Sequence, residues 1–258
     1  MFVASQGLYF WAIPNDRDLG LFSAAATLAM TPSLITSKIL QTFFLPLLSR
    51  VQDDQVKFDA QSAVTLQTLL CVGGIAAIAF SIFGPFLFLL TFGEKMQDGA
   101  IYVVPIGLAF SVLLVRAGAM LPIALARGYT MNQFLGNLVR LVSLPIAWIV
   151  VTNGGGILDL LMVTIGAQIA ALTLTAVLLQ VKVKIDAPRR MLGSYTLGLL
   201  LVIVLAAQVY TGEEGTWIFA VQAALYVTTV ATCGDLRRTL IVLGKIYLAK
   251  AKVKANWS

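Results

Sequence analysis

The chain has 258 residues, of which 59% are hydrophobic and only 12% are charged, and its net charge is +6. Ordinary soluble domains carry about 25% charged residues, so this composition excludes a soluble globular protein and indicates a membrane protein. With no histidine and only two cysteines, Cys71 and Cys233, each inside an apolar run and far apart in sequence, we expect no metal site, no cofactor, no Cys/His nucleophile and no disulfide.

In chain order, the apolar stretches predict the end of a truncated span in residues 1–12 and then seven complete transmembrane helices. A bilayer core about 30 Å thick requires about 20 apolar residues per helix, whereas the strands of a barrel would alternate apolar and polar residues. The predicted fold is therefore all-α, a polytopic helical membrane bundle. The seven spans are expected at about residues 19–48, 60–90, 100–126, 133–151, 157–180, 191–211 and 216–234.

Three segments are expected along the chain. Residues 1–180 are predicted to form a transmembrane bundle, and residues 181–234 to add two further transmembrane helices. Residues 235–258 are a basic tail, in which the stretch 235–252 places leucines on one helical face and basic residues on another. We expect this tail to lie on the membrane surface.

Lysine and arginine are distributed unevenly between the connections. The connections on one side carry thirteen of them, and those on the other side carry two, Arg17 and Lys95. Such an excess is typical of the cytoplasmic side, so the C-terminus and the loops 49–59, 127–132 and 181–190 are expected in the cytoplasm. The same bias explains the net positive charge, and no nucleic-acid partner is expected.

Three basic residues, Lys38, Arg116 and Arg140, remain inside predicted spans. At 1.5 Å per residue they lie roughly 10–15 Å from the cytoplasmic ends of their helices, and no acidic residue lies deep in a span. One interpretation is snorkelling, in which a long side chain brings its charge to the interface. The other is a polar cavity, since an arginine near mid-bilayer costs about 2.5–3.5 kcal/mol to insert when nothing compensates.

Polar residues accompany two of these charges at helical spacing, which indicates a polar lining. The residues that share a face with Arg140 are Gln133, Asn137 and Ser143, and those that share a face with Lys38 are Thr31, Gln41 and Thr42. Weaker polar stripes in other spans are typical of ordinary hydrogen bonds between helices. A positively charged cavity fits an anionic substrate, because phosphate-type groups pair with guanidinium groups. A cation carrier would instead need buried carboxylates.

The stretch from Asp16 to Asp54 reads DRDLGLFSAAATLAMTPSLITSKILQTFFLPLLSRVQDD, with Pro32 in the middle of an alanine-rich helix and LPLLSR ahead of a charged loop. It resembles the start of the C-terminal half of bacterial polysaccharide flippases, which belong to the multidrug/oligosaccharidyl-lipid/polysaccharide exporter superfamily. Further along, LTFGEKMQDGA resembles an outer loop of that family and ALARGYTMNQ a short cytoplasmic turn. The family's usual Gly-x-Tyr appears here as Gly-Leu-Phe at residues 20–22, a mild departure.

The resemblance implies a multidrug-exporter-like fold in which two bundles face a central cavity and this chain supplies the C-terminal bundle. It therefore implies that the chain is a fragment, a truncated reading frame or one part of a split protein. The implied location is the bacterial inner membrane, where the protein would move an undecaprenyl-diphosphate-linked oligosaccharide to the outer leaflet by alternating access.

On this resemblance, Arg116 and Arg140, assisted by Lys38, would attract the diphosphate, and the polar side chains named above would line the route of the sugars. The spans 191–211 and 216–234 would flank a groove for the lipid tail. The implied partners are the anionic lipid-linked oligosaccharide, membrane lipids and the polysaccharide polymerase or export machinery.

Three other functions stay open at this point. A multidrug or cation antiporter would share the fold but would hold acidic residues in its cavity. A membrane-embedded glycosyltransferase, polymerase or ligase would need catalytic residues, often on a large outer loop, whereas the longest outer loop here has about nine residues. A non-catalytic subunit of a polysaccharide assembly complex is the third. We expect a transporter and no enzymatic activity.

Overall fold

The computed structural model describes residues 16–211, 216–239 and 241, and within these residues the chain is helical with no strand. The helices are α2 (Asp16–Ser49), α3 (Gln55–Phe92), the 3-10 turn η1 (Glu94–Gly99), α4 (Ala100–Val115), the π-helical turn η2 (Arg116–Met120), α5 (Leu121–Ala126), α6 (Met131–Thr152), α7 (Ile157–Leu178), the π-helical turn η3 (Leu179–Val183), α8 (Ala187–Arg190), α9 (Leu192–Thr211) and α10 (Thr216–Thr232). The prediction of an all-α polytopic bundle is confirmed.

Six helical segments of the described chain are long and apolar enough to cross a membrane. They are Asp16–Ser49, Gln55–Phe92, Glu94–Ala126, Met131–Thr152, Ile157–Val183 and Leu192–Thr211. The seventh predicted span corresponds to α10, which is apolar but 17 residues long. The expected partial span in residues 1–12 and most of the expected tail helix lie outside the described residues.

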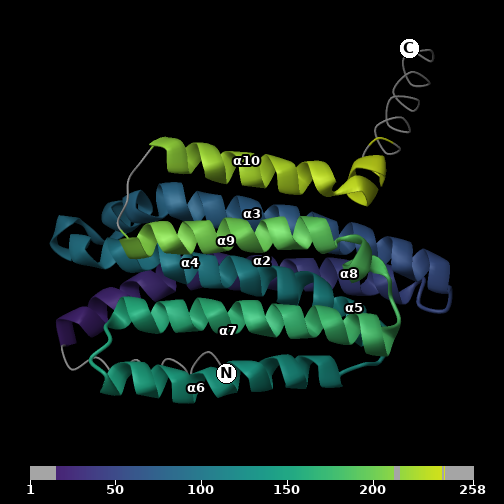
Figure 1. Cartoon of the computed structure of the whole chain (residues 1–258), viewed down its shortest axis with the longest axis horizontal. Helices are drawn as coiled ribbons and strands as arrows, with labels where there is room; N and C mark the ends of the chain where they lie inside the picture. Colours follow the sequence, from purple (N-terminus) through teal and green to yellow (C-terminus); the bar gives the residue numbers. More distant parts are fainter. Residues whose placement is uncertain (1–15, 212–215, 240, 242–258) are drawn as a thin grey trace, which may run out of the picture.

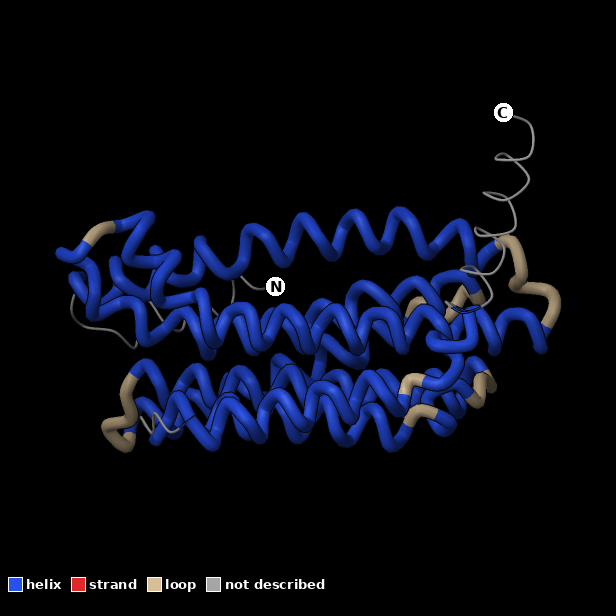
Figure 2. Tube along the Cα trace, turned by 90° about the horizontal axis from the view of Figure 1, so that it is seen from above, coloured by secondary structure: helices blue, strands red, loops and turns tan. Residues whose placement is uncertain are grey.

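The long helices run roughly parallel and are joined by short connections at the two ends of the bundle (Figures 1 and 2). The segment α4–η2–α5 lies at the centre, because α4 packs against α2, α3, α7 and α9. In its most apolar stretch 72% of the residues are buried, against at most 39% in the other five spans. Helix α6 packs on α7, at the edge of the bundle.

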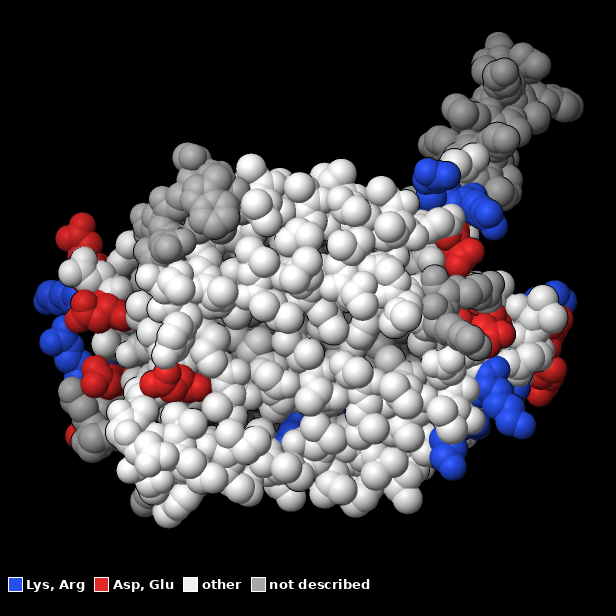
Figure 3. All heavy atoms as spheres, viewed as in Figure 1, with Lys and Arg blue, Asp and Glu red and all other residues white. Residues whose placement is uncertain are grey.

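Charged side chains gather at the two ends of the helices and leave a broad uncharged belt between them, broken by one small basic patch on the face in view (Figure 3). Such a belt is the surface that the hydrocarbon core of a bilayer requires. We call the end that carries the connections 50–54, 127–130 and 184–186 the basic end. The described lysines and arginines near it include Arg50, Lys57, Arg127, Lys182 and Lys184.

At the basic end, the first turn of α3 holds these connections together. Asp54 caps the helix, since its carboxylate accepts hydrogen bonds from the backbone N–H groups of Val56 and Lys57, both at 3.1 Å. The backbone hydrogen bond from Lys57 lowers the pKa of Asp54, and the Lys57 side chain lowers it further. Gln55 accepts a hydrogen bond from Arg127 at 2.6 Å and donates one to the carbonyl of Lys184 at 2.8 Å.

The two cysteines meet in the structure although they are far apart in sequence. The packing of α10 against α3 brings the sulfur atoms of Cys71 and Cys233 to 3.8 Å, and both are free thiols. This contact could not be predicted from the sequence, because helix packing and not spacing along the chain creates it.

Candidate functional site

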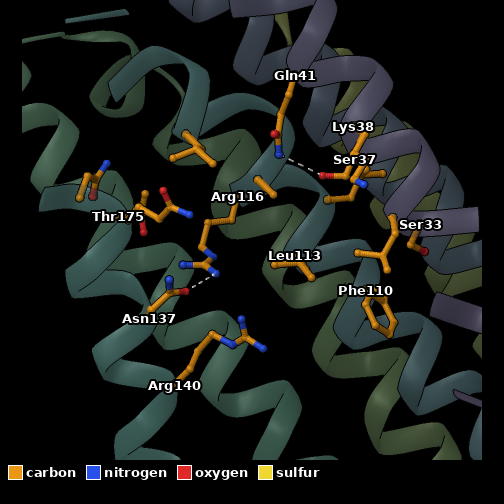
Figure 4. A pocket seen from close by; sticks show the side chains of 16 residues that line it. Ser33, Ser37, Lys38, Gln41, Phe110, Leu113, Arg116, Asn137, Arg140 and Thr175 are labelled. Carbon is orange, nitrogen blue, oxygen red and sulfur yellow. Dashed lines mark hydrogen bonds between the residues drawn. The ribbon is translucent and has the colours of Figure 1, made fainter. Parts of the chain in front are cut away.

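A cavity of about 370 Å³ lies between α2 and α6, with α4 and η2 behind it (Figure 4). Helix α2 packs on α4, α4 on α7 and α7 on α6, so α2 and α6 form facing walls of this cavity. The lining residues are Ser33, Leu34, Ser37, Lys38, Gln41, Phe110, Leu113, Leu114, Arg116, Ala117, Leu121, Asn132, Gln133, Asn137, Arg140 and Thr175. All three intramembrane cations predicted from the sequence therefore line one cavity.

Arg116 begins the π-helical turn η2 in the middle of the central span. The backbone N–H of Leu121 donates to the carbonyl of Arg116, five residues back, as a π-helical turn requires. We attribute this turn to Pro122, which has no N–H and whose ring would contact the carbonyl four residues back. Such turns are frequent at functional sites, and here the turn coincides with a charge.

The guanidinium of Arg116 points from the central helix toward α6. Its side chain is 8% exposed, and Nη2 donates a long hydrogen bond of 3.4 Å to Oδ1 of Asn137. Nε has no hydrogen-bond partner among the described residues. Gly136 makes this placement possible, because a Cβ at that position would lie 2.6 Å from Nη1 of Arg116. The side chain therefore stays inside the bundle and does not snorkel to the basic end.

Arg140 and Lys38 lie on the two walls. In Figure 4, Arg140 extends from α6 toward the same space as Arg116, and Lys38 lies across the cavity on α2. No acidic residue is among the described lining residues, and none of the three cations forms an ion pair with a residue that the structure describes. Three positive charges thus share one cavity, and no residue that the structure describes supplies a counter-charge there.

The polar residues predicted to line a cavity divide into two groups. Gln133, Asn137 and Gln41 do line it, and Gln41 donates a hydrogen bond of 3.4 Å to Ser37. The hydroxyls of the other three bond to backbone carbonyls of their own helices, and these residues are absent from the lining: Thr31, Thr42 and Ser143.

Sequence reasoning missed several lining residues, of which Asn132 is the most unusual. It is 1% exposed, and neither its Oδ1 nor its Nδ2 has a hydrogen-bond partner among the described residues. Its position could have indicated this in the sequence, since Asn132 lies four residues before Gly136, next to the polar face of Gln133 and Asn137. Thr175 of α7 and Ser33 and Ser37 of α2 also line the cavity without having been predicted.

The described residues hold no group of three or more His, Cys, Asp or Glu side chains that could bind a metal ion. The described acidic side chains with assigned contacts act near helix ends. Asp98 pairs with Arg17 at 2.8 Å, and Asp159 accepts a hydrogen bond from the backbone of Gly156 at 2.8 Å. The cavity thus presents guanidinium, ammonium and amide groups, which are the kinds of group that pair with anions.

Comparison with known proteins gives one match. Residues 12–101 match a family model described as "Polysaccharide biosynthesis protein". The matched part covers α2, α3 and η1 and includes Lys38, whereas Arg116 and Arg140 lie beyond it. No curated protein and no solved structure matches the chain. Over its first spans, this multi-pass membrane protein is thus similar to proteins of polysaccharide biosynthesis.

Proposed function

We propose that the protein is a flippase that moves a lipid-linked oligosaccharide across the bacterial inner membrane, without catalysing a reaction. The cargo would be an oligosaccharide on a polyprenyl diphosphate, such as undecaprenyl diphosphate, taken up from the cytoplasmic leaflet and released to the outer leaflet by alternating access. The family match of residues 12–101 supports a role in polysaccharide biosynthesis. We also propose that the basic end faces the cytoplasm.

One observation carries the proposal: a buried arginine that has no acidic partner among the described residues, in a cavity that two more cations line. Arg116 is 8% exposed, and its Nε has no partner among the described residues. A charge near mid-bilayer costs about 2.5–3.5 kcal/mol unless something compensates. A diphosphate would compensate it, because each phosphate supplies several acceptor oxygens in the geometry that a guanidinium matches.

The size and the lining of the cavity support the same cargo. Its volume of about 370 Å³ falls within the range of about 300–1,000 Å³ that is typical of small-molecule sites. It has room for a diphosphate and an adjoining sugar, while a longer glycan would extend through the open side. A cation antiporter would need carboxylates, and none is among the described lining residues.

The test is complementation of a bacterial strain that lacks its polysaccharide flippase, with the protein expressed from its full reading frame. We expect Arg116→Gln and Arg140→Gln to lower surface polysaccharide by about tenfold or more, because a hydrogen bond to a charged group contributes about 1.5–3 kcal/mol. Arg50→Gln is the matched control, since Arg50 is exposed at the basic end and does not line the cavity.

Membrane extracts must contain equal amounts of each variant. Partial rescue by Arg116→Lys would indicate that positive charge matters more than bidentate pairing. The substrate-charge role would be refuted if Arg116→Gln and Arg140→Gln both restored surface polysaccharide to the wild-type level.

A further inference from the structure

Asn132 has a buried donor and a buried acceptor beside the cavity. Neither takes part in the proposed pairing of the cations with the diphosphate. The residue lies in the first turn of α6, lines the cavity and is 1% exposed. Neither atom of its amide has a hydrogen-bond partner among the described residues. An unpaired buried polar group costs about 1–3 kcal/mol, and buried amides in native proteins are generally paired. Because the residue lines the cavity, a cargo that shifts the covering side chains could supply the missing partners.

The place of Asn132 on α6 relates it to Arg116. Asn132 and Gly136 are four residues apart, so they lie one above the other on one face of the helix, about 6 Å apart along its axis. The guanidinium of Arg116 rests against Gly136, where a Cβ would lie 2.6 Å from Nη1. A phosphate group held by Arg116 would thus have Asn132 about one sugar ring away.

We propose that Asn132 recognises the sugar next to the diphosphate and so determines part of the specificity for the cargo; this rests on the proposed function. An amide presents a donor and an acceptor side by side. A sugar matches it with a hydroxyl group or with an acylamino group, since both can donate and accept at once. A phosphate does not match it, because its oxygens would satisfy the amide N–H groups and repel the amide oxygen.

The experiment measures binding of three probes to the purified full chain in detergent micelles by native mass spectrometry. The probes are a polyprenyl diphosphate without sugar, the same lipid with one hexose, and the same lipid with one N-acetylhexosamine. Asn132→Leu removes both polar atoms at a similar side-chain volume. Asn153→Leu, the same change at the exposed opposite end of α6, is the matched control.

We expect the wild type to bind at least one sugar-bearing lipid about tenfold more tightly than the sugar-free lipid, as two hydrogen bonds allow. Asn132→Leu should lose this preference and leave binding of the sugar-free lipid within twofold of wild type. Whether the hexose or the N-acetylhexosamine probe loses affinity identifies a hydroxyl or an acylamino group as the recognised feature. Asn153→Leu should bind all three probes as the wild type does.

Several results would overturn this role. One is that Asn132→Leu still prefers the sugar-bearing lipid as the wild type does. Another is that Asn132→Leu loses the same affinity for all three probes. The third is that the wild type binds the three probes with equal affinity. A wild type that binds none of them would instead refute the proposed function itself.

The thermal unfolding midpoint separates recognition from a structural role. Because Asn132 loses no partner within the described residues, Asn132→Leu should not lower the midpoint, whereas a clear decrease would indicate a structural amide. If Asn132→Leu does not elute as a single species, Asn132→Ala, which has a smaller side chain, is used for the same binding comparison.

Discussion

Where α9 and α10 pack together, two buried polar side chains, Ser194 and Gln222, are each hydrogen-bonded to a residue of the neighbouring helix. Ser194 on α9 donates to Thr232 on α10 at 2.8 Å, and Gln222 on α10 donates to Gln208 on α9. Hydrogen bonds of this kind join helices in membranes, where water offers no alternative partner. This side of the bundle uses its polar groups for structure.

Where α2, α4 and α6 surround the cavity, the pattern is the opposite. Nε of Arg116 and both amide atoms of Asn132 are buried and have no hydrogen-bond partner among the described residues. Three other described residues, Ser62, Arg127 and Gln168, also have a buried atom without such a partner, but none of them lines this cavity. Polar character alone therefore does not distinguish a structural contact between helices from a candidate binding site. Polar groups that line a cavity without a hydrogen-bond partner are a more specific indication of such a site.

Gly136 leaves room for the guanidinium of Arg116, and substituting it should impair transport strongly. Gly136→Ala places a methyl group 2.6 Å from the present position of Nη1 of Arg116, so the guanidinium must move. We expect complementation to fall by about tenfold, since a displacement of about 1 Å in a binding group is costly. The unfolding midpoint should fall only slightly, because the flexible end of Arg116 gives way, while Oγ1 of Thr175, 3.0 Å from the added Cβ, must shift by a few tenths of an ångström.

Gly166→Ala on α7 is the control for this change, because an added Cβ there has no neighbour within 4 Å. It should leave both transport and stability at the wild-type level. Wild-type complementation by Gly136→Ala would contradict the functional importance of the guanidinium position.

The hydrogen bond between α9 and α10 should make a modest but measurable contribution to stability. Gln208 and Gln222 form a hydrogen-bonded pair between these helices, and Gln222 is 3% exposed. A double-mutant cycle with Gln208→Leu and Gln222→Leu should give a coupling free energy of about 0.6 kcal/mol in micelle unfolding experiments. Asn132→Leu should not lower the free energy of unfolding, because the amide of Asn132 has no hydrogen-bond partner among the described residues. Zero coupling for the glutamine pair would remove the distinction between paired and unpaired polar groups.

The smallest effect is expected outside the membrane, at Asp54. The hydrogen bonds of Lys57 lower the pKa of this carboxyl, so its stabilising contribution is present above about pH 4, the ordinary range of aspartate, and is lost as the pH falls through the lowered value. Asp54→Ala should therefore lower the unfolding midpoint slightly at pH 7, and this difference from wild type should shrink near pH 3. An equal difference at both pH values would argue against the charged cap.

The fold could be predicted closely because apolar runs determine where spans lie. The span expected at 133–151 is Met131–Thr152, and the one expected at 100–126 ends at Ala126 as predicted. The span expected at 60–90 begins earlier, at Gln55, because Asp54 caps a polar helical turn that hydrophobicity does not detect. The seventh span is represented by the shorter helix α10.

The charges of the candidate site could also be predicted, whereas its geometry could not. Unpaired basic residues in apolar stretches identified Lys38, Arg116 and Arg140, and the structure brings them to one cavity. Spacing along α2 favoured the face with Thr31, Gln41 and Thr42. Of these only Gln41 lines the cavity, because packing on α4 turns Ser33 and Ser37 into it in place of the two threonines. Whether the amide of Asn132 has a hydrogen-bond partner depends on contacts between helices, which one sequence does not reveal.

Arg116 is proposed to bind the diphosphate of the cargo, so the affinity of a sugar-free polyprenyl diphosphate for the purified protein in micelles should depend on it. Relative to wild type, we predict a dissociation constant at least about tenfold higher for Arg116→Gln and within twofold for the control Arg50→Gln. Equal affinities of the wild type and Arg116→Gln would contradict the account.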